Sequence, residues 1–534
     1  MDSDPNYFKS LETIMNLGKL RRLECALALT IGLCLLAANA AAMDSFFIGP
    51  RAMGMAGANV ASTTDTTAQY YNPAAFGFFN RTKEPAEGSA TRIESDSNNM
   101  GRKSWGLGLG AAAGYRLHNE FGLYIDDLSK IDYQRLSTDG LQSRSDLEDL
   151  IRLFKNLEGL DNPGNGVSAT INGNLGVRIN HFGIGALALS EASGQVISLD
   201  TANLGFSMDA ATVGSDIANI DMSGTSYDST GYTMQVFTPA QVSELCGTLG
   251  DPTCTTTLEA VQRLDYIASQ QNINSSDVQT TVELLNNSIG QSGTGTSLAN
   301  NTTTVLLKGF GVLEVPISYG YALNDHISFG GNLKFMRGRV YANEVLVFDD
   351  NSGDTLSKSD EYYEESSNFG IDLGVMARMD KLSFGLVGRN LNSPKFDGFT
   401  KTVTVNGSPV TITADDVKIR PQVAAGLAYI PFETLTLETD IDLTRNATTF
   451  SDYRTQKFSV GLEWDAFRVL ALRLGGYKNL AESDIGWVYT AGLGLNLWAA
   501  RLDIAGAFAG EKTRFDDKDY PKETRASLQL SVDF

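Results

Sequence analysis

The chain has 534 residues, of which 53 are glycine and 42% are hydrophobic. A hydrophobic fraction this large excludes a disordered chain. The formal net charge is −21. This balance excludes nucleic acid as a partner, because nucleic acid binds clustered lysines and arginines. It also excludes a polybasic protein of the membrane surface.

Residues 1–42 have the pattern of a secretory signal peptide. A basic flank around Lys19 precedes the apolar stretch 26–38, and small residues ending at Ala40 or at Ala42 fit a cleavage site. We expect cleavage at Ala42. The alternative is an uncleaved N-terminal anchor, because the apolar tract is long enough to resemble a membrane helix.

Residues 43–95 form the next segment, which opens with glycines and contains a proline bend. Gly54 and Gly57 would let the backbone pass close to barrel walls, which Gly106, Gly108 and Gly110 would provide. Pro73 fixes a bend and holds Asn72 extended. We expect this segment to plug the barrel that the following residues predict. An ordinary structured N-terminal arm is the alternative.

Trp105–Tyr115 is the first strong strand signal. Large apolar residues alternate with Gly106, Gly108 and Gly110 on the opposite face. The strand would be roughly 33 Å long, and a tilt of about 40° projects this to about 25 Å, the height of a membrane barrel's apolar band. Inward glycines predict that another part of the chain approaches closely.

Two insertions interrupt the strands, at about 128–167 and 192–308. Each contains apolar residues at helical spacing. We interpret both as extracellular loops with short helices; the alternative is a separate soluble domain. Cys246 and Cys254 lie close together in the second insertion, and oxidising conditions outside the cytoplasm predict a disulfide rather than two free thiols.

The rest of the chain repeats one alternation up to its last residue. Thr434–Leu443, Lys457–Trp464 and Arg525–Phe534 each place apolar residues on one face and polar residues on the other. A soluble antiparallel sheet gives the same pattern in a single segment. The number of segments, about fifteen, favours a transmembrane antiparallel β-barrel of 14–16 strands over residues 96–534.

The connections between these strands alternate in length. Short turns, as at Asp380, are followed by long polar segments, as at 392–418 and 511–522. Short turns on one rim and long loops on the other are typical of outer-membrane barrels. After residue 42 no apolar run is long enough for a membrane helix. We therefore expect an all-β protein in the outer membrane of a Gram-negative-type bacterium.

The segment after Ala42 resembles the start of a known family. The stretch Gly49-Pro50-Arg51-Ala52-Met53-Gly54-Met55-Ala56-Gly57-Ala58 and the motif Tyr70-Tyr71-Asn72-Pro73-Ala74 are similar to FadL-type outer-membrane transporters of hydrophobic compounds. They resemble most the TraF-like branch named after conjugative transfer, and also PorV-type secretion barrels. The resemblance implies a plug in the lumen that contains Asn72, Pro73 and Ala74. It also implies that a terminal aromatic, Phe534, is the signal read by the barrel-assembly machinery.

The sequence carries no catalytic constellation, and we expect no enzyme, cofactor or metal. His118, His181 and His326 lack neighbours at zinc-ligand spacing, and each is expected at the surface near a strand end. Asp349–Asp354 lacks the ligand order of a calcium loop. Charged residues at inward positions either form ion pairs across strands or line a water-filled path through the barrel. They are Glu438, Asp440, Asp442, Lys457, Glu463, Arg473, Arg501 and Asp503.

Two hypotheses for function follow. The first is passive uptake of hydrophobic small molecules through a plugged channel. The second is a non-enzymatic scaffold for a conjugative-transfer or secretion apparatus, whose loops contact partner proteins. In both cases the expected partners include membrane lipid and lipopolysaccharide. An apolar cavity beside the plug would favour transport, and a charged, filled lumen would favour the scaffold.

Overall fold

The structure is a computed structural model of the whole chain. It describes residues 43–80, 103–133, 135–136, 141–200, 203–204, 210–273, 278–290, 300–347, 362–405, 408–466, 469–497, 500–516 and 518–534. The expected signal peptide, its cleavage site at Ala42, the end of the 43–95 segment and Asp349–Asp354 lie wholly or partly outside these ranges.

Fourteen strands of the described residues close into one antiparallel barrel. Each strand pairs with its neighbours in chain order, and β1 pairs with the last strand to close the ring. The predicted barrel of 14–16 strands is therefore confirmed. Its strands are β1 (Trp105–His118), β2 (Gly166–Ile179), β3 (Phe182–Ser198), β4 (Thr304–Ala322), β5 (Ile327–Leu346), β6 (Tyr363–Met379), β7 (Leu382–Arg389), β12 (Gln422–Phe432), β13 (Leu435–Asp442), β16 (Lys457–Ala466), β17 (Leu470–Asn479), β18 (Trp487–Leu497), β19 (Ala500–Ala509) and β22 (Glu523–Asp533).

The closing pair of strands shows why the sequence alternates. Leu109 of β1 lies opposite Leu530 of β22, and both side chains are more than half exposed on the outer surface. Gly108 and Gln529, one residue along, face the filled interior. Successive strand residues point to opposite faces, so one run of sequence supplies both an apolar outer wall and a polar inner wall.

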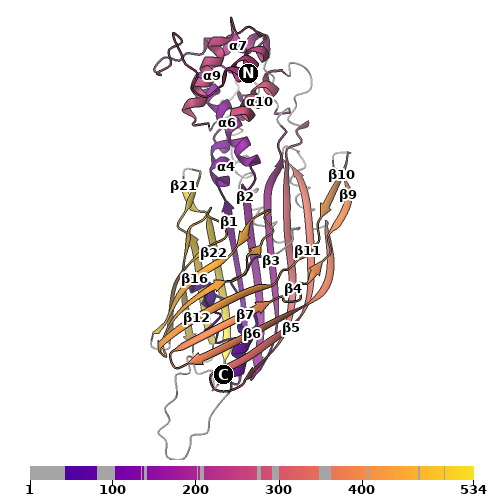
Figure 1. Cartoon of the computed structure of the whole chain (residues 1–534), viewed down its shortest axis with the longest axis vertical. Helices are drawn as coiled ribbons and strands as arrows, with labels where there is room; N and C mark the ends of the chain where they lie inside the picture. Colours follow the sequence, from indigo (N-terminus) through magenta and orange to yellow (C-terminus); the bar gives the residue numbers. More distant parts are fainter. Residues whose placement is uncertain are drawn as a thin grey trace, which may run out of the picture.

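The two ends of the barrel differ (Figure 1). The short connections lie at the end that carries the C-terminus, and the long connections lie at the other end. β3 and β4 extend further into the second predicted insertion than the pattern suggested, to Ser198 and from Thr304. Some long connections contain small hairpins. These hairpin strands are β8 (Lys395–Phe396), β9 (Phe399–Val405), β10 (Ser408–Ala414), β11 (Val417–Lys418), β14 (Asn446–Ala447), β15 (Arg454–Thr455), β20 (Lys512–Phe515) and β21 (Lys518–Pro521).

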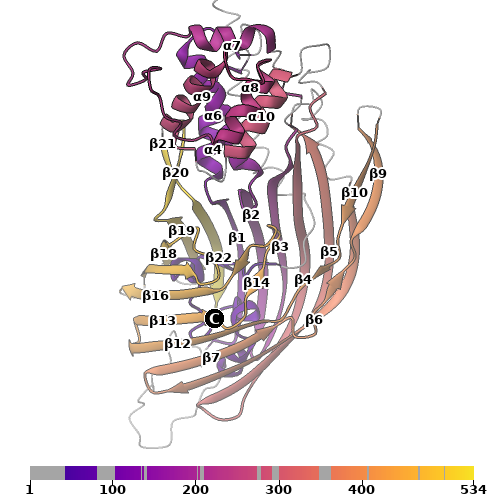
Figure 2. The same cartoon turned by 45° about the horizontal axis from the view of Figure 1, so that its top comes forward.

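A helical head stands on the long-loop end (Figures 1 and 2). Helices from both insertions share one hydrophobic core, in which Phe154, Leu264 and Leu285 are fully buried. Ser143 and Thr238 begin two of the helices with reciprocal capping bonds. The helices of the head are α4 (Phe121–Ser129), α6 (Arg144–Asp161), α7 (Ala210–Asn219), α8 (Pro239–Thr248), α9 (Leu258–Gln270) and α10 (Val278–Gly290).

Residues 43–80 fold inside the barrel and are called the plug below. They form helix α2 (Pro50–Gly54), helix α3 (Ala68–Tyr71) and the 3-10 helix η1 (Pro73–Phe78). α2 packs against the wall of β17, β18, β19 and β22, and η1 packs against β4, β5 and β6. Nearly every plug residue is buried. Across the described ranges, no helix is both long and apolar enough to cross a membrane.

Candidate functional site

The interface between the plug and the inner wall is the candidate functional site. Its first part is local: the hydroxyl oxygen of Tyr70 accepts a hydrogen bond from the Phe46 amide (2.7 Å), and that of Tyr71 accepts one from Ile48 (2.9 Å). Burial raises the pKa of both tyrosines above the ordinary value. Both hydroxyls therefore stay protonated and fasten the first plug residues onto α3.

The Asn72-Pro73-Ala74 motif lies at the turn into η1. The Asn72 side-chain oxygen accepts from the Ala74 amide (3.1 Å), while its nitrogen donates to the carbonyls of Val60 (3.0 Å) and Val375 (3.1 Å). Pro73 occupies the first helical position, where no backbone donor is needed. Asn72 thus ties the plug to itself and to β6 through one side chain.

Glycines of the wall allow the plug backbone to lie against it. A Cβ on Gly461 would lie 2.6 Å from the Cβ and carbonyl oxygen of Met55, and one on Gly475 would lie 2.8 Å from the Met55 carbonyl carbon. In return, a Cβ on Gly54 would lie 2.9 Å from the Cβ of Arg473. These distances are below van der Waals contact, so any larger residue would displace the plug.

Only one of the three β1 glycines that were expected to face the plug contacts it. Of the three on β1, Gly108 meets the Thr66 side chain of the plug, whereas Gly106 and Gly110 meet side chains of the wall, Asp533 and Asn174. The expectation for Gly106 and Gly110 was wrong, because adjacent inward side chains of a barrel also fill the space above a glycine. The expectation that Gly57 lies against the wall was also wrong, because Gly57 packs against Phe47 within the plug. Its φ of 96° is one that glycine adopts readily.

One side of the lumen is charged. Arg51 of the plug pairs with Glu463 (3.0 Å), which also pairs with Arg473 (2.6 Å). Asp440 accepts from the amide of Asn59 (2.8 Å) and from that of Val60, and Glu438 accepts from that of Ala61. The inward charges thus pair across strands or bond the plug backbone. The same holds for the pairs of Arg473 and Arg501 with Asp503.

Asp44, at the start of the plug, lies among three cations. Its carboxylate contacts Lys457 (3.0 Å), Arg116 (3.9 Å) and Arg525 (3.9 Å). Burial by itself raises the pKa of Asp44, but the three cations outweigh burial and hold the pKa below its usual value. Asp44 is therefore ionised and anchors the plug electrostatically to β1, β16 and β22.

The opposite side of the lumen carries an apolar cluster beside charged residues such as Glu191, Glu314 and Lys334. Inward side chains of β3, β4 and β5 form a continuous cluster with the first plug residues and with the β8 and β11 hairpin. The rings of Phe310 and Phe396 lie 5.2 Å apart and join the wall to the hairpin. We call this cluster the apolar strip. Its members include Leu187, Leu189, Phe310, Val312, Met336, Val340, Phe396, Val417, Ile419, Met43, Phe46 and Ile48.

Two hollows lie near the plug. A cavity of about 40 Å³ beside Phe47, Tyr71 and Lys457 has room for about one water molecule. A hollow of about 480 Å³ lies over β17, β18 and β19 and is lined largely by small and aliphatic residues, among them Ala491 and Gly506. Gly492 in this wall also lies against Gly54, so the wall is thin there.

The three histidines do not share one environment. His118, expected at the surface, is buried, and its ring stacks on Phe450 with centroids 4.1 Å apart. It contacts the Ser168 hydroxyl (2.9 Å) and Asp484 (3.6 Å). These residue types also form hydrolytic triads, but Ser168 is buried and lines neither hollow. The group therefore links β1, β2 and the loop before β18.

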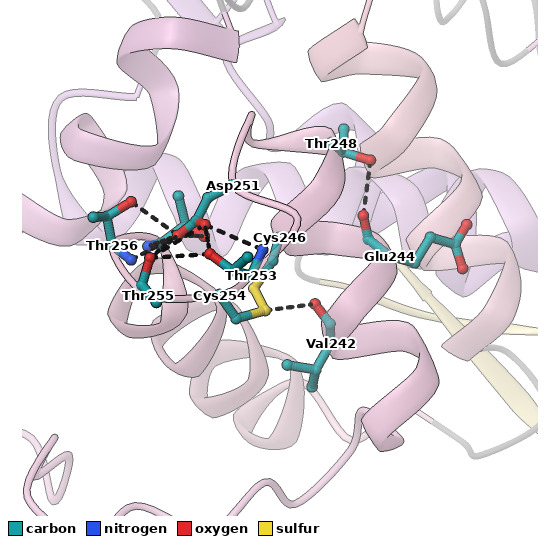
Figure 3. Close-up of a disulfide and its surroundings, with 10 residues drawn as sticks. Val242, Glu244, Cys246, Thr248, Asp251, Thr253, Cys254, Thr255 and Thr256 are labelled. Atoms are coloured by element: carbon teal, nitrogen blue, oxygen red, sulfur yellow. Dashed lines mark hydrogen bonds between the residues drawn. A yellow bond between two sulfur atoms is a disulfide. The ribbon is translucent and has the colours of Figure 1, made fainter.

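The remaining predicted residues lie at the two ends of the molecule. Cys246 and Cys254 form a disulfide in the head (Figure 3), with an S–S distance of 2.01 Å. Beside it the Asp251 carboxylate accepts from the Thr256 amide (2.6 Å), a bond that lowers the pKa of Asp251. Phe534 lies at the other end, stacked on Trp105 with ring centroids 5.1 Å apart.

Comparison with known proteins finds one sequence family and several solved structures that are similar to this chain. A sequence family described as "F plasmid transfer operon, TraF, protein" matches residues 69–442. No curated protein is significantly similar in sequence. Similar solved structures include the Pseudomonas putida toluene transporter TodX, with 11% identity over 92% of this chain and 98% of that one, TM-score 0.41. They also include the CymD monoaromatic hydrocarbon channel (12%, 92% and 99%, 0.44) and a Pseudomonas aeruginosa FadL homologue (10%, 93% and 99%, 0.41).

The fold and the site together define a plugged antiparallel β-barrel. Within that class, the chain belongs to the TraF family, whose match covers well over half of its length. The TraF-like resemblance that the sequence predicted is thereby confirmed.

Proposed function

We propose that the protein is an outer-membrane channel for small hydrophobic molecules, which enter at the long-loop end and move along the apolar strip to the plug. The strip carries this proposal. The interior of a membrane barrel is ordinarily polar, yet Leu189, Val312 and Val340 point inward here and are buried. The exposed apolar residues of the outer wall, such as Leu109, would contact lipid and lipopolysaccharide.

Passage requires side chains to move, because the strip is filled by its own residues. Phe396 closes it from the hairpin side and Phe46 from the plug side. Both are held by apolar contacts that a hydrophobic ligand can replace at little cost, since such contacts are not directional. The charged side of the lumen, in contrast, keeps the plug bonded through Glu463 and Asp440. A ligand can thus loosen one side of the plug while the other side holds it.

A matched pair of substitutions tests this route. Val312→Thr places a hydroxyl in the strip without changing the shape of the side chain, and Val488→Thr does the same at a buried inward position of β18 outside it. Covering this hydroxyl with a hydrocarbon ligand would leave it without a hydrogen-bond partner, at a cost of about 1 kcal/mol or more. This cost corresponds to about a fivefold or larger decrease in the rate of uptake. Uptake of a small aromatic hydrocarbon into vesicles should fall with Val312→Thr and not with Val488→Thr. Equal effects would reject the route.

A second candidate function is a scaffold in a conjugative-transfer apparatus. Three observations favour it. The chain belongs to the TraF family, the lumen is filled and much of its wall is charged, and residues 199–303 of the head contain eleven acidic residues and one basic residue. In a scaffold the head would contact partner proteins, and the lumen would stay closed. Replacing the head by a short loop should then abolish plasmid transfer, and the wild type should show no hydrocarbon uptake. Uptake by the wild type, with plasmid transfer unaffected by loss of the head, would favour the channel.

A further inference from the structure

Met43 and Asp44, the first two residues of the plug, lie inside the lumen. Met43 is 4% exposed and Asp44 is 2% exposed. The Met43 carbonyl accepts a hydrogen bond from the Gln422 side chain of β12 (2.9 Å), and the Asp44 amide donates one to Glu191 of β3 (2.9 Å). Wall residues from two distant strands therefore fix the backbone at the point where the signal peptide is expected to end.

Glu191 is a buried acid that accepts two hydrogen bonds from backbone amides. It is 2% exposed, and its other hydrogen bond comes from the backbone amide of Thr449 (3.2 Å). Among the residues that the structure describes, no cationic side chain lies within ion-pair distance of Glu191, since Lys457, Arg116 and Arg525 contact Asp44 and Glu523 instead. A buried carboxylate without a counter-ion is costly.

We propose that cleavage after Ala42 supplies this counter-ion, and that the α-ammonium group of Met43 pairs with Glu191 inside the barrel. Backbone nitrogens of adjacent residues lie on the order of 3 Å apart. The Met43 nitrogen therefore lies within about 6 Å of the Glu191 carboxylate, which the Asp44 amide reaches at 2.9 Å. Contact between the two charges requires a change in the backbone torsion angles of Met43.

The chemistry balances with water as the only co-reactant. Hydrolysis of the Ala42–Met43 peptide bond leaves a carboxylate on Ala42 and an amine on Met43. An α-amino group has an ordinary pKa of about 8, and a neighbouring carboxylate stabilises its protonated form. Before cleavage the same nitrogen is an uncharged amide. Processing thus changes the charge of the lumen by one unit at Glu191, independently of what the barrel transports.

The first experiment locates the amine in the protein purified from membranes. N-terminal sequencing should give Met43; a mature chain that begins at Ala41 or elsewhere would overturn the proposal. A small acylating reagent at neutral pH should then modify the α-amine at least about tenfold more slowly in the folded protein than in urea, where burial and pairing are lost. Equal rates in the two states would also overturn it.

The second experiment removes only the charge. In Met43→Gln the mature N-terminus is glutamine, which glutaminyl cyclase converts to uncharged pyroglutamate in the unfolded protein before refolding. Cyclisation should lower the midpoint temperature of the heat-induced gel-mobility shift by a few degrees when Glu191 is present. The same treatment of Met43→Gln combined with Glu191→Gln should shift the midpoint little, because no carboxylate is left to pair.

A matched control separates pairing from general sensitivity. Glu314→Gln makes the same change on the neighbouring strand β4, where Glu314 already pairs with Lys334 (3.3 Å). Cyclisation should lower the midpoint temperature of the gel-mobility shift as much in the Glu314→Gln background as with the native Glu314. If cyclisation has the same effect in the Glu191→Gln and Glu314→Gln backgrounds, the α-ammonium does not pair with Glu191 and the proposal fails.

Discussion

Gly461→Ala tests the close packing of the plug against the barrel wall. The new methyl carbon would lie 2.6 Å from the Cβ and the carbonyl oxygen of Met55, whereas carbon atoms in contact are about 3.5–4.0 Å apart. The overlap is therefore about 1 Å, and half of it is with backbone. Added volume of this kind costs about 1–3 kcal/mol.

The cost falls on seating the plug and not on forming the barrel. With the plug unseated, the methyl group has space, and alanine suits a strand better than glycine by about 0.5–1 kcal/mol. The plug should also lose contact two residues further along β16, where Glu463 pairs with Arg51 (3.0 Å). A penalty of about 1–3 kcal/mol raises the unseated population about fivefold to about a hundredfold.

Single-channel recording in planar bilayers measures this population as open probability. Gly506→Ala is the matched control, because its methyl group would meet only an ordinary contact at 3.7 Å. Gly461→Ala should open at least about fivefold more often than the control, with a similar midpoint temperature of unfolding. An open probability equal to that of Gly506→Ala would refute the packing argument.

Three further predictions concern the head, the C-terminus and pH. Cys246 and Cys254 should react with thiol reagents only after reduction, and labelling before reduction would contradict the disulfide. Cys254→Ser should destabilise the head by roughly 2–3 kcal/mol in the chain-entropy model, without changing the gel mobility of the barrel. Deleting Phe534, which stacks on Trp105, should reduce the amount of assembled barrel, as heat-modifiable migration shows, more than Leu258→Ala at an exposed site in the head. The pKa of Asp44 is lowered, so the stability it adds is complete above its unfolded pKa of about 4 and is lost as pH falls through the folded value. Open probability should therefore rise in acid in the wild type, and much less in Asp44→Asn; parallel pH curves would count against this anchor.

The barrel wall was predictable because its signal is local. Alternation in Arg525–Phe534 reports two faces with different surroundings, and repetition of that pattern along the chain fixes the class of fold. The inward positions of Glu463 and Asp440 follow from the same count. The helices of the head were predictable in part, since the apolar spacing around Phe154 marks α6.

The lumen was predictable only in outline, because its contacts join residues far apart in sequence. Gly461 faces Met55 and Glu191 faces Asp44, and no spacing rule connects such pairs. The apolar strip was missed, because the sequence pattern around Leu189 and Val312 is that of an ordinary strand. Only the structure shows that the hairpin with Phe396 packs against them. His118 was misplaced for the same reason: its cover, Phe450, comes from a distant loop.

The most direct test of the channel is one reconstitution with two readouts. Vesicles and planar bilayers are made with the wild type and with a variant that lacks residues 43–80, the plug. The account predicts that the wild type passes almost no ionic current yet accelerates entry of a small aromatic hydrocarbon, and that the deletion variant carries large, steady current. A wild type that fails to accelerate hydrocarbon entry, or that conducts ions as a porin does, would contradict it.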